Sequence, residues 1–350
     1  MENRIYIKVK VLNSKFKIVG LGKLRGTSME IEERELSKLN IEAEIVAGRF
    51  TATEDEFIAQ YKDADIILGG GRLFTRRVIE SLPKCRAIIT YSVGFDGIDV
   101  DAATDNGILV VNNPASEWCI EEVSNHAVTL LLICAKKLTQ LNSLTKKGSW
   151  MESRGLTTSM ASIHGQILGL VGCGAIARMA AKKAQCFGLK VIGYDPYLDN
   201  SFTRQFGISL MGLPELLKES DFVSVHAPLS KETEHLIGEE EFKLMKPTTY
   251  LINTARGNVI DEAALIKALQ EKRIAGAGLD VFEKEPINPD NPLLKMDNVT
   301  VSPHSASFSD ASLDLQPVNP THEAARVLSG KWPKNVINRT VKPKIELTKE

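Results

Sequence analysis

The chain has 350 residues, and this length suggests about two domains. Hydrophobic residues make up 43% of it and charged residues 25%, as in ordinary soluble proteins. The formal net charge of −1 gives no electrostatic case for binding to nucleic acid or to an anionic membrane surface. The longest near-continuous apolar run, 127–135, is shorter than a membrane-spanning helix.

The cysteines and the N-terminal segment indicate a cellular compartment. The five cysteines are odd in number and form no C-x-x-C pair, so neither a disulfide framework nor a metal site is expected. Residues 1–8 alternate charged with apolar side chains and lack the apolar core of a signal peptide. We therefore expect a cytoplasmic protein without a bound metal.

The first third of the chain alternates between expected strands and helices. Such alternation predicts a parallel sheet with helices on both faces. Thr53, with Glu56 three residues later, resembles a capping box at a helix start. The expected strands are 16–21, 43–46, 66–68, 87–91 and 108–111, and the expected helices are 30–39, 53–61 and 75–82. Residues 1–14 precede this pattern and are a candidate edge strand only.

A glycine-containing loop, 91–99, follows the fourth of these strands. Loops at the carboxyl ends of parallel strands are where α/β sheets bind their ligands. We therefore expect the backbone N–H groups of Val93 and Gly94 to bind a substrate.

The segment 123–138 is nearly all apolar and is predicted to form a helix. A helix that is apolar on every side is buried, here between layers of the fold or between subunits. Ser116 is a candidate cap for its beginning.

An apolar strand, 167–171, ends at a glycine turn that opens a helix. Gly172, Gly174 and Ala177 fill the G-x-G-x-x-G/A pattern of dinucleotide-binding folds. The first glycine permits the tight turn, the second lets the backbone approach a pyrophosphate, and the alanine lets the helix pack closely on the strand. The N–H groups and the dipole at the helix start favour an anion there. Because strand, turn and helix agree, the motif predicts a bound dinucleotide rather than a plain turn.

Apolar residues continue along this helix at 176, 177, 180, 181, 184 and 187, and Gly188 suits its C-terminal end. The second strand, 189–194, then ends at Asp195. An acid there accepts two hydrogen bonds from a ribose diol and repels a 2′-phosphate. Neither of the next two residues, Pro196 and Tyr197, is a cation that would receive such a phosphate. The site therefore predicts NAD rather than NADP.

Polar residues follow the carboxyl end of each remaining strand. The expected strands are 222–225, 250–253, 276–281 and 299–301, and the expected helices are 213–217 and 261–270. A last helix is expected to begin with Asn319 as its cap and Pro320 at its first position, and to run to Gly330.

Arg256, Glu285 and His304 each lie just after a strand of this half, so they can converge above the nicotinamide. Oxidation of an alcohol to a ketone needs a hydride acceptor, a base and an anchor for the substrate. Imidazole titrates near neutral pH, so His304 suits the acid/base. Glu285 can hold its other ring nitrogen, and Arg256 can bind a carboxylate through two parallel bonds.

Structural roles compete with each of these assignments, because clustered polar groups only sometimes mark a site. His226 also follows a strand and fits a cofactor pocket and a structural hydrogen bond equally well. The remaining histidines show no partner in the sequence and are expected to be structural.

The motifs Gly172–Ala177, Val225–Pro228, Asn253–Gly257, Gly278–Pro286 and Ser302–His304, in this order, resemble the D-isomer-specific 2-hydroxyacid dehydrogenases, including their C-terminal-binding-protein-like branch. The resemblance covers about residues 15–340 and implies Arg256 as substrate anchor, Glu285 as partner of the base and His304 as acid/base. It also implies cofactor contacts at Ala175, Ile176, Asp195, Ala227, Pro228, Thr233, Thr254, Ala255 and Asp280.

The resemblance implies an α/β fold of two Rossmann-like, doubly wound parallel-sheet domains with an active-site cleft between them. The expected substrate domain comprises 1–113 and 306–350, and the expected NAD-binding domain 114–305. Dimers or tetramers built on the NAD-binding domains are usual in the family, so a homodimer through these domains is expected, with a tetramer as the alternative. The implied activity is NAD-dependent interconversion of a small D-2-hydroxy acid and its 2-keto acid. The alternative is an NAD(H)-sensing, corepressor-like scaffold with weak dehydrogenase activity.

The chain departs from the family in its first loop. Phosphoglycerate dehydrogenases tend to carry Arg-Ser where this chain has Gly69-Gly70, so a phosphate group would lose its partner. A phosphorylated substrate is therefore disfavoured.

The chain also departs from the family near its C-terminus. Pro317 and Pro320 interrupt a helix that is usually continuous in the family.

Overall fold

The structure is a computed structural model that describes residues 16–21, 28–49, 51, 53–70, 74–113 and 117–349. The candidate edge strand at 1–14 and the candidate cap Ser116 lie outside these residues. The chain divides into two compact units, one comprising Met1–Ser116 with Ser309–Glu350 and the other Glu117–Phe308.

The first unit contains a parallel sheet of five strands in the order β2-β1-β3-β4-β5 within its described part. The strands are β1 (Lys17–Gly20), β2 (Glu44–Ala47), β3 (Ile66–Leu68), β4 (Ala87–Ile89) and β5 (Leu109–Val111). Strands β3, β4 and β5 are short apolar runs whose side chains are all buried, because helices cover both faces of the sheet.

Helices of the first unit divide between the two faces of this sheet. Helices α2, α3 and α4 pack on one face through Phe57, Val78 and Ala102. Helices α1 and α14 pack on the other face through Leu36 and Ala324. The helices are α1 (Glu30–Lys38), α2 (Glu54–Tyr61), α3 (Arg76–Glu80), α4 (Val100–Asp105), α13 (Asp310–Leu315) and α14 (Val318–Leu328).

The second unit contains a parallel sheet in the order β12-β11-β10-β9-β6-β7-β8. Its strands are β6 (Ile167–Val171), β7 (Lys190–Tyr194), β8 (Ile208–Leu210), β9 (Phe222–Val225), β10 (Tyr250–Asn253), β11 (Gly276–Leu279) and β12 (Val299–Val301). The strand order reverses between β6 and β9, which is the position where doubly wound sheets bind ligands. Together the two sheets confirm the predicted α/β, doubly wound fold class.

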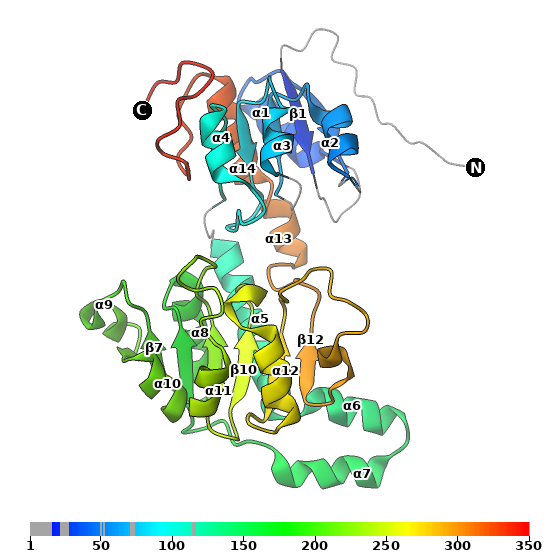
Figure 1. Ribbon diagram of the computed structural model, residues 1–350, viewed down its shortest axis with the longest axis vertical. Coiled ribbons are helices and arrows are strands. Elements are labelled where there is room, and N and C mark those ends of the chain that lie inside the picture. The colour runs from blue at the N-terminus through cyan, green and yellow to red at the C-terminus, as the bar shows by residue number, and fades with distance from the viewer. Residues whose placement is uncertain are drawn as a thin grey trace. The chain divides into compact units, whose positions relative to one another are not determined.

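Helices also cover both faces of the second sheet, with α10, α11 and α12 in front of it in Figure 1. The opposite face is covered by α5 and α8, which pack on β6 and β10 through Leu130, Leu131 and Ala181. The helices are α5 (Glu117–Ala135), α6 (Leu138–Lys146), α7 (Trp150–Gly155), α8 (Ala175–Cys186), α9 (Asn200–Arg204), α10 (Leu213–Glu219), α11 (Glu239–Leu244) and α12 (Glu262–Gln270). Short 3₁₀ turns lie at Leu156–Ser159, Gly257–Val259 and Pro292–Lys295.

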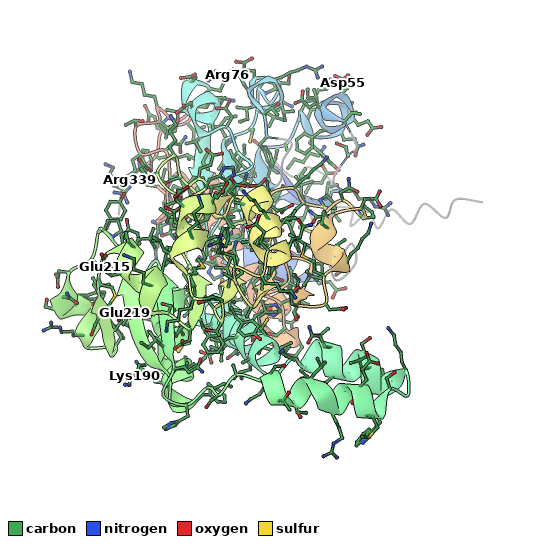
Figure 2. The ribbon with its side chains drawn as sticks, turned by 60° about the horizontal axis from the view of Figure 1, so that its bottom comes forward. Asp55, Arg76, Lys190, Glu215, Glu219 and Arg339 are labelled. Carbon is green, nitrogen blue, oxygen red and sulfur yellow. The ribbon has the colours of Figure 1, made fainter. Side chains whose placement is uncertain are left out.

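Charged side chains lie on the outside of this unit. Lys190, Glu215 and Glu219 are exposed, and Figure 2 shows them at the edge of the molecule. On α10 the two glutamates face solvent while Leu216 and Leu217 are buried, so the helix packs by one apolar face.

Helix boundaries correct three sequence expectations. The apolar helix predicted at 123–138 ends at Ala135, because Lys137 adopts a left-handed conformation (φ 51°) and a new helix begins at Leu138. Phe187, expected on the buried face of α8, follows that helix and is 47% exposed.

Asn319 was expected to cap the last helix but lies inside α14, which begins at Val318. Its side chain instead donates to Asn113 Oδ1 at 2.9 Å. Pro317 separates α13 from α14, as its missing N–H group requires, whereas Pro320 is tolerated in the first turn of α14.

Candidate active site

Gly172 makes the turn between β6 and α8 at the point where the strand order reverses. Its φ of 89° is left-handed, and a Cβ there would lie 2.7 Å from the backbone nitrogen of Ala227. The two loops are also joined by the His226 N–H group, which donates to Val171 O at 2.8 Å. A side chain at 172 would therefore push apart the glycine turn and the loop 226–228.

The N-terminus of α8 fits a phosphate group. Gly174 is its N-cap and provides no side-chain hydrogen bond, so the first N–H groups of the helix point out without a capping side chain. A Cβ on Gly174 would meet nothing within 4 Å, so there is open space beside this end of the helix. Ala175 and Ile176 supply the first helical residues. Open space and N–H groups together are what a pyrophosphate needs.

Asp195 is fixed against the glycine turn. Its Oδ2 accepts from the Cys173 N–H group at 2.9 Å, and its Oδ1 accepts from the Tyr197 N–H group at 3.0 Å. A carboxylate oxygen can accept a further bond, so both oxygens keep capacity for a ribose diol. The residues of the glycine turn and Asp195 thus fit an adenosine dinucleotide.

The loop after β9 carries His226, Ala227 and Pro228. Burial lowers the pKa of His226 to about 4, so its ring is neutral at pH 7. The ring nitrogen Nε2 lies 2.9 Å from Ser224 Oγ. Thr233 closes this loop, because its hydroxyl donates to Pro228 O at 2.6 Å and accepts from the Ser230 N–H group at 2.8 Å.

The loop after β10 begins with a buried polar atom. Thr254 Oγ1 is buried and has no hydrogen-bond partner among the described residues, which is costly unless a ligand provides one. Asn253 braces the same loop: its Oδ1 accepts from the Ala255 N–H group and its Nδ2 donates to Arg256 O, both at 2.9 Å. An unsatisfied hydroxyl in a braced loop fits the predicted cofactor contact at Thr254.

His304 and Glu285 form a close pair. The Nδ1 atom of His304 lies 2.7 Å from Glu285 Oε2, and Glu285 Oε1 accepts from the Phe282 N–H group at 3.0 Å. The His304 side chain is 49% exposed, and no hydrogen bond engages its Nε2 atom among the described residues. The carboxylate therefore fixes one ring nitrogen and leaves the other to a reactant.

Arg256 follows β10, and the chain after it packs against the Glu285 loop. A Cβ on Gly257 would lie 1.9 Å from the carbonyl carbon of Phe282, so only glycine permits this backbone contact. The Arg256 guanidinium donates through Nη1 to Ala255 O at 2.7 Å. Because Gly257 lets the two backbones touch, the chain that carries Arg256 packs directly on the loop that carries Glu285.

Asp280, at the end of β11, supports the loop that carries His304. Its carboxylate is fully buried and accepts from the N–H groups of Ser305 and Ala306 at 2.8 and 2.9 Å. Its carbonyl oxygen accepts from the His304 N–H group at 2.8 Å. The cofactor contact expected of Asp280 stays a prediction, whereas its contacts with the His304 loop are shown.

The loop 91–94 of the first unit has its carbonyl oxygens occupied. Those of Ser92 and Val93 accept from Thr90 Oγ1 at 2.5 Å and Asn112 Nδ2 at 2.9 Å, and that of Gly94 accepts from Ser92 Oγ at 3.0 Å. Among the described residues the N–H groups of Val93 and Gly94 have no hydrogen-bond partner. A loop that bonds through its carbonyls and leaves two neighbouring N–H groups unused can accept an anion.

Sequence reasoning missed the asparagines that support this loop. Asn113 is buried, donates to Tyr91 O at 3.2 Å and accepts from Asn319. The signal in the sequence was the pair Asn112-Asn113 directly after β5, at the carboxyl edge of the sheet. The described residues contain no group of three or more histidine, cysteine, aspartate or glutamate side chains suited to a metal ion.

Comparisons with known proteins agree with this geometry. Residues 128–306 match the family model described as "D-isomer specific 2-hydroxyacid dehydrogenase, NAD binding domain". A "Glyoxylate reductase" of Korarchaeum cryptofilum is 38% identical over 319 residues, which are 89% of this chain and 95% of that protein. A "D-3-phosphoglycerate dehydrogenase" of Methanocaldococcus jannaschii is 38% identical over 88% of this chain and 57% of its own length.

A solved structure is similar as well. The holo form of Rhodotorula graminis D-mandelate dehydrogenase matches with a TM-score of 0.82 and 26% identity, over 95% of this chain and 100% of that one. The chain belongs to the D-isomer-specific 2-hydroxyacid dehydrogenase family. It is an NAD-dependent dehydrogenase of this family, as the resemblance of its motifs implied. No helix among the described residues is long and apolar enough to cross a membrane.

Proposed function

We propose that the protein reduces small, unphosphorylated 2-keto acids to 2-hydroxy acids, with NADH as hydride donor. Glyoxylate would give the achiral glycolate, and longer keto acids would give the D-isomer. The observation that carries this proposal is the His304–Glu285 pair, whose 2.7 Å contact orients an imidazole with one nitrogen left for a reactant. The name of the Korarchaeum relative supports glyoxylate as the first substrate to test.

Each proposed residue has a separate role. Arg256 binds the substrate carboxylate through two parallel bonds, and the N–H groups of Val93 and Gly94 are a further candidate contact for an anionic group. His304 donates the proton that the developing alkoxide requires, and Glu285 stabilises the imidazolium that serves as donor. NADH supplies the hydride when it is bound.

Gly69 argues against a phosphorylated substrate. Its φ of 125° is rare for residues with side chains, and a Cβ there would lie 2.8 Å from Leu21 O. A basic residue cannot replace it without moving the backbone, so this position provides no cation for a phosphate.

A screen of NADH consumption tests the proposed function. Glyoxylate, hydroxypyruvate, pyruvate, longer 2-keto acids and 3-phosphohydroxypyruvate are compared at equal concentration. We expect a kcat on the order of 1–10³ s⁻¹ for an unphosphorylated acid. Tight NADH binding with negligible turnover of every acid would instead support the sensing scaffold, and a preference for the phosphorylated acid would overturn the substrate class.

Asp195 is expected to set the cofactor preference. NADH should give a higher kcat/KM than NADPH, because the carboxylate accepts from the ribose diol and repels a 2′-phosphate. In Asp195→Ala the ratio of kcat/KM with NADH to kcat/KM with NADPH should fall, because NADH loses its bonds to the carboxylate and the 2′-phosphate of NADPH is no longer repelled. Steady-state kinetics with both cofactors measures it, and equal kcat/KM values in the unmutated protein would contradict the prediction.

We also propose a homodimer, for which α6 and α7 of the second unit provide the surface. Figure 1 shows these helices extending away from the sheet of their unit. They expose Leu138, Trp150 and Met151 by 53%, 60% and 77%. Apolar side chains grouped on a projecting segment are typical of an interface.

Light scattering after gel filtration tests this surface. The protein should have the mass of a dimer, and Trp150→Glu with Met151→Glu should shift it toward the monomer. Phe187→Glu, at an exposed phenylalanine that directly follows α8, is the matched control and should leave the dimer intact. A monomeric unmutated protein would contradict the proposal.

A reducing compartment such as the cytoplasm remains the expected location. All five cysteines are free, and four of them are buried. Burial raises the pKa of the Cys173 thiol to about 12, so this cysteine in the glycine turn is neutral and unreactive.

A further inference from the structure

Two residues outside the assigned site, His126 and Ser302, contact the support of the His304 loop. The Nε2 atom of His126, on α5, lies 2.8 Å from Ser302 Oγ, and Ser302 Oγ lies 2.6 Å from Asp280 Oδ1. Nε2 of His126 is also 3.5 Å from Asp280 Oδ1. A histidine of one helix, a serine after β12 and an aspartate after β11 thus form one hydrogen-bonded network.

The hydrogen bonds define the protonation of His126. The N–H groups of Ser305 and Ala306 can only donate, so the Asp280 oxygens are acceptors and the Ser302 hydroxyl donates to one of them. Ser302 has no second proton, and its oxygen therefore accepts from His126. The ring of His126 must carry a proton on Nε2.

One face of α5 contacts the loop at two points. Cys119, Val123 and His126 follow one another at helical spacing, so they share this face. Cys119 and Val123 pack on the buried Ala306, and His126 bonds to Ser302. The helix thus holds the residues on both sides of His304, by apolar contact at one and by a hydrogen bond at the other.

The loop needs such support because His304 has a φ of 51°, in the left-handed region that non-glycine residues rarely adopt. A strained backbone persists only where its surroundings fix it. Its N–H group donates to Asp280 O, and the two following N–H groups donate to the Asp280 carboxylate. The orientation of that carboxylate therefore decides where the His304 ring lies.

We propose that His126 and Ser302 are positioning residues: through Asp280 they hold the His304 loop in its reactive geometry. This inference rests on the proposed function for its kinetic consequence, but not for its structural one. Neither residue needs to touch substrate or cofactor. Their loss should lower kcat while leaving the affinity for NADH within about twofold, because the glycine turn is unchanged.

Four variants and one control test the proposal. His126→Leu removes the donor, and His126→Gln retains an N–H group at a similar distance from the helix. Ser302→Ala and Ser302→Thr form the corresponding pair at the other residue. His164→Leu alters an exposed histidine of the same unit that takes no part in the network.

Hydrogen–deuterium exchange of peptides covering 302–308 provides a readout that needs no turnover. His126→Leu and Ser302→Ala should speed exchange of the Ser305 and Ala306 amides about tenfold, as expected for the loss of one hydrogen bond. They should lower kcat about ten- to a hundredfold through misplacement of the imidazole. His126→Gln, Ser302→Thr and His164→Leu should stay within about threefold of the unmutated protein in both measurements.

The outcomes separate two failures. Unchanged exchange in His126→Leu and Ser302→Ala would overturn the inference, and so would a His126→Gln variant as impaired as His126→Leu. A protein that turns over no 2-keto acid would overturn the proposed function, while the exchange measurement would still decide whether the network holds the loop.

Discussion

Replacement of His304 by asparagine should lower kcat by about 10²–10⁴-fold, the usual contribution of a general acid/base. The expected loss falls on kcat because the proton is transferred in the transition state, whereas binding of the keto acid depends on other groups. Asparagine is chosen because it tolerates the left-handed backbone at this position. Steady-state kinetics of glyoxylate reduction gives both constants.

The chain provides a matched control in His235. It too has a left-handed backbone (φ 52°) and a carboxylate partner, with Nε2 lying 2.9 Å from Glu283 Oε1. His235→Asn therefore removes a similar histidine–carboxylate contact at a residue that the proposed proton transfer does not use, and kcat should stay within about threefold. Equal losses in the two variants would mean that His304 serves the fold rather than the reaction.

Glu285, the carboxylate partner of His304, should determine the pH dependence of keto reduction. In the proposed mechanism keto reduction uses the imidazolium of His304, and the Glu285 carboxylate lies 2.7 Å from the Nδ1 atom of that ring. Removing the charge in Glu285→Gln disfavours the protonated ring, so the profile of kcat/KM for reduction should move to lower pH. Oxidation of the hydroxy acid requires the neutral ring and should suffer less at neutral pH. An unchanged reduction profile in a folded, active variant would make Glu285 structural.

The sequence predicted the parts of this fold that depend on local patterns. Strands β9 and β10 begin and end where their apolar runs do, and the left-handed Gly172 lies where the motif requires a tight turn. Thr53 caps α2 through its hydroxyl oxygen, which accepts from the Glu56 N–H group. Such features were predictable because the residues that determine them are neighbours in the chain.

Features that depend on distant residues were not predictable in this way. α6 lacks buried residues and α7 buries only Ser153, so neither helix packs into the core of its unit, and neither was expected from the sequence. His126 showed no partner in the sequence because its partner, Ser302, follows a strand 176 residues away. The break at Lys137 likewise lies between residues whose side chains alone would continue a helix.

Arg256 should be the residue on which substrate affinity depends most. Arg256→Lys keeps the charge but loses the planar fork that binds a carboxylate through two parallel bonds. A hydrogen bond to a charged group contributes about 1.5–3 kcal/mol, which corresponds to an increase in KM for the keto acid of roughly 10- to 100-fold. kcat should fall as well if the carbonyl is displaced from the hydride donor.

The fold offers reasons to attribute such a change to the guanidinium alone. Asn253 holds the Arg256 carbonyl, and Gly257 packs against the Phe282 backbone, so the main chain at 256 is fixed without the side chain. Arg273→Lys, at an exposed arginine of the same unit, is the control and should leave both constants unchanged.

A substrate lacking the carboxylate completes the test. The amide of the same 2-keto acid retains the carbonyl to be reduced but offers no anion for a charged fork. The unmutated protein should prefer the acid over the amide, and Arg256→Lys should lose most of that preference, because only the acid uses the second parallel bond. If Arg256→Lys instead lowered kcat/KM equally for acid and amide, the arginine would not bind the carboxylate, and the anchor would have to lie elsewhere, with the N–H groups of Val93 and Gly94 as the next residues to test.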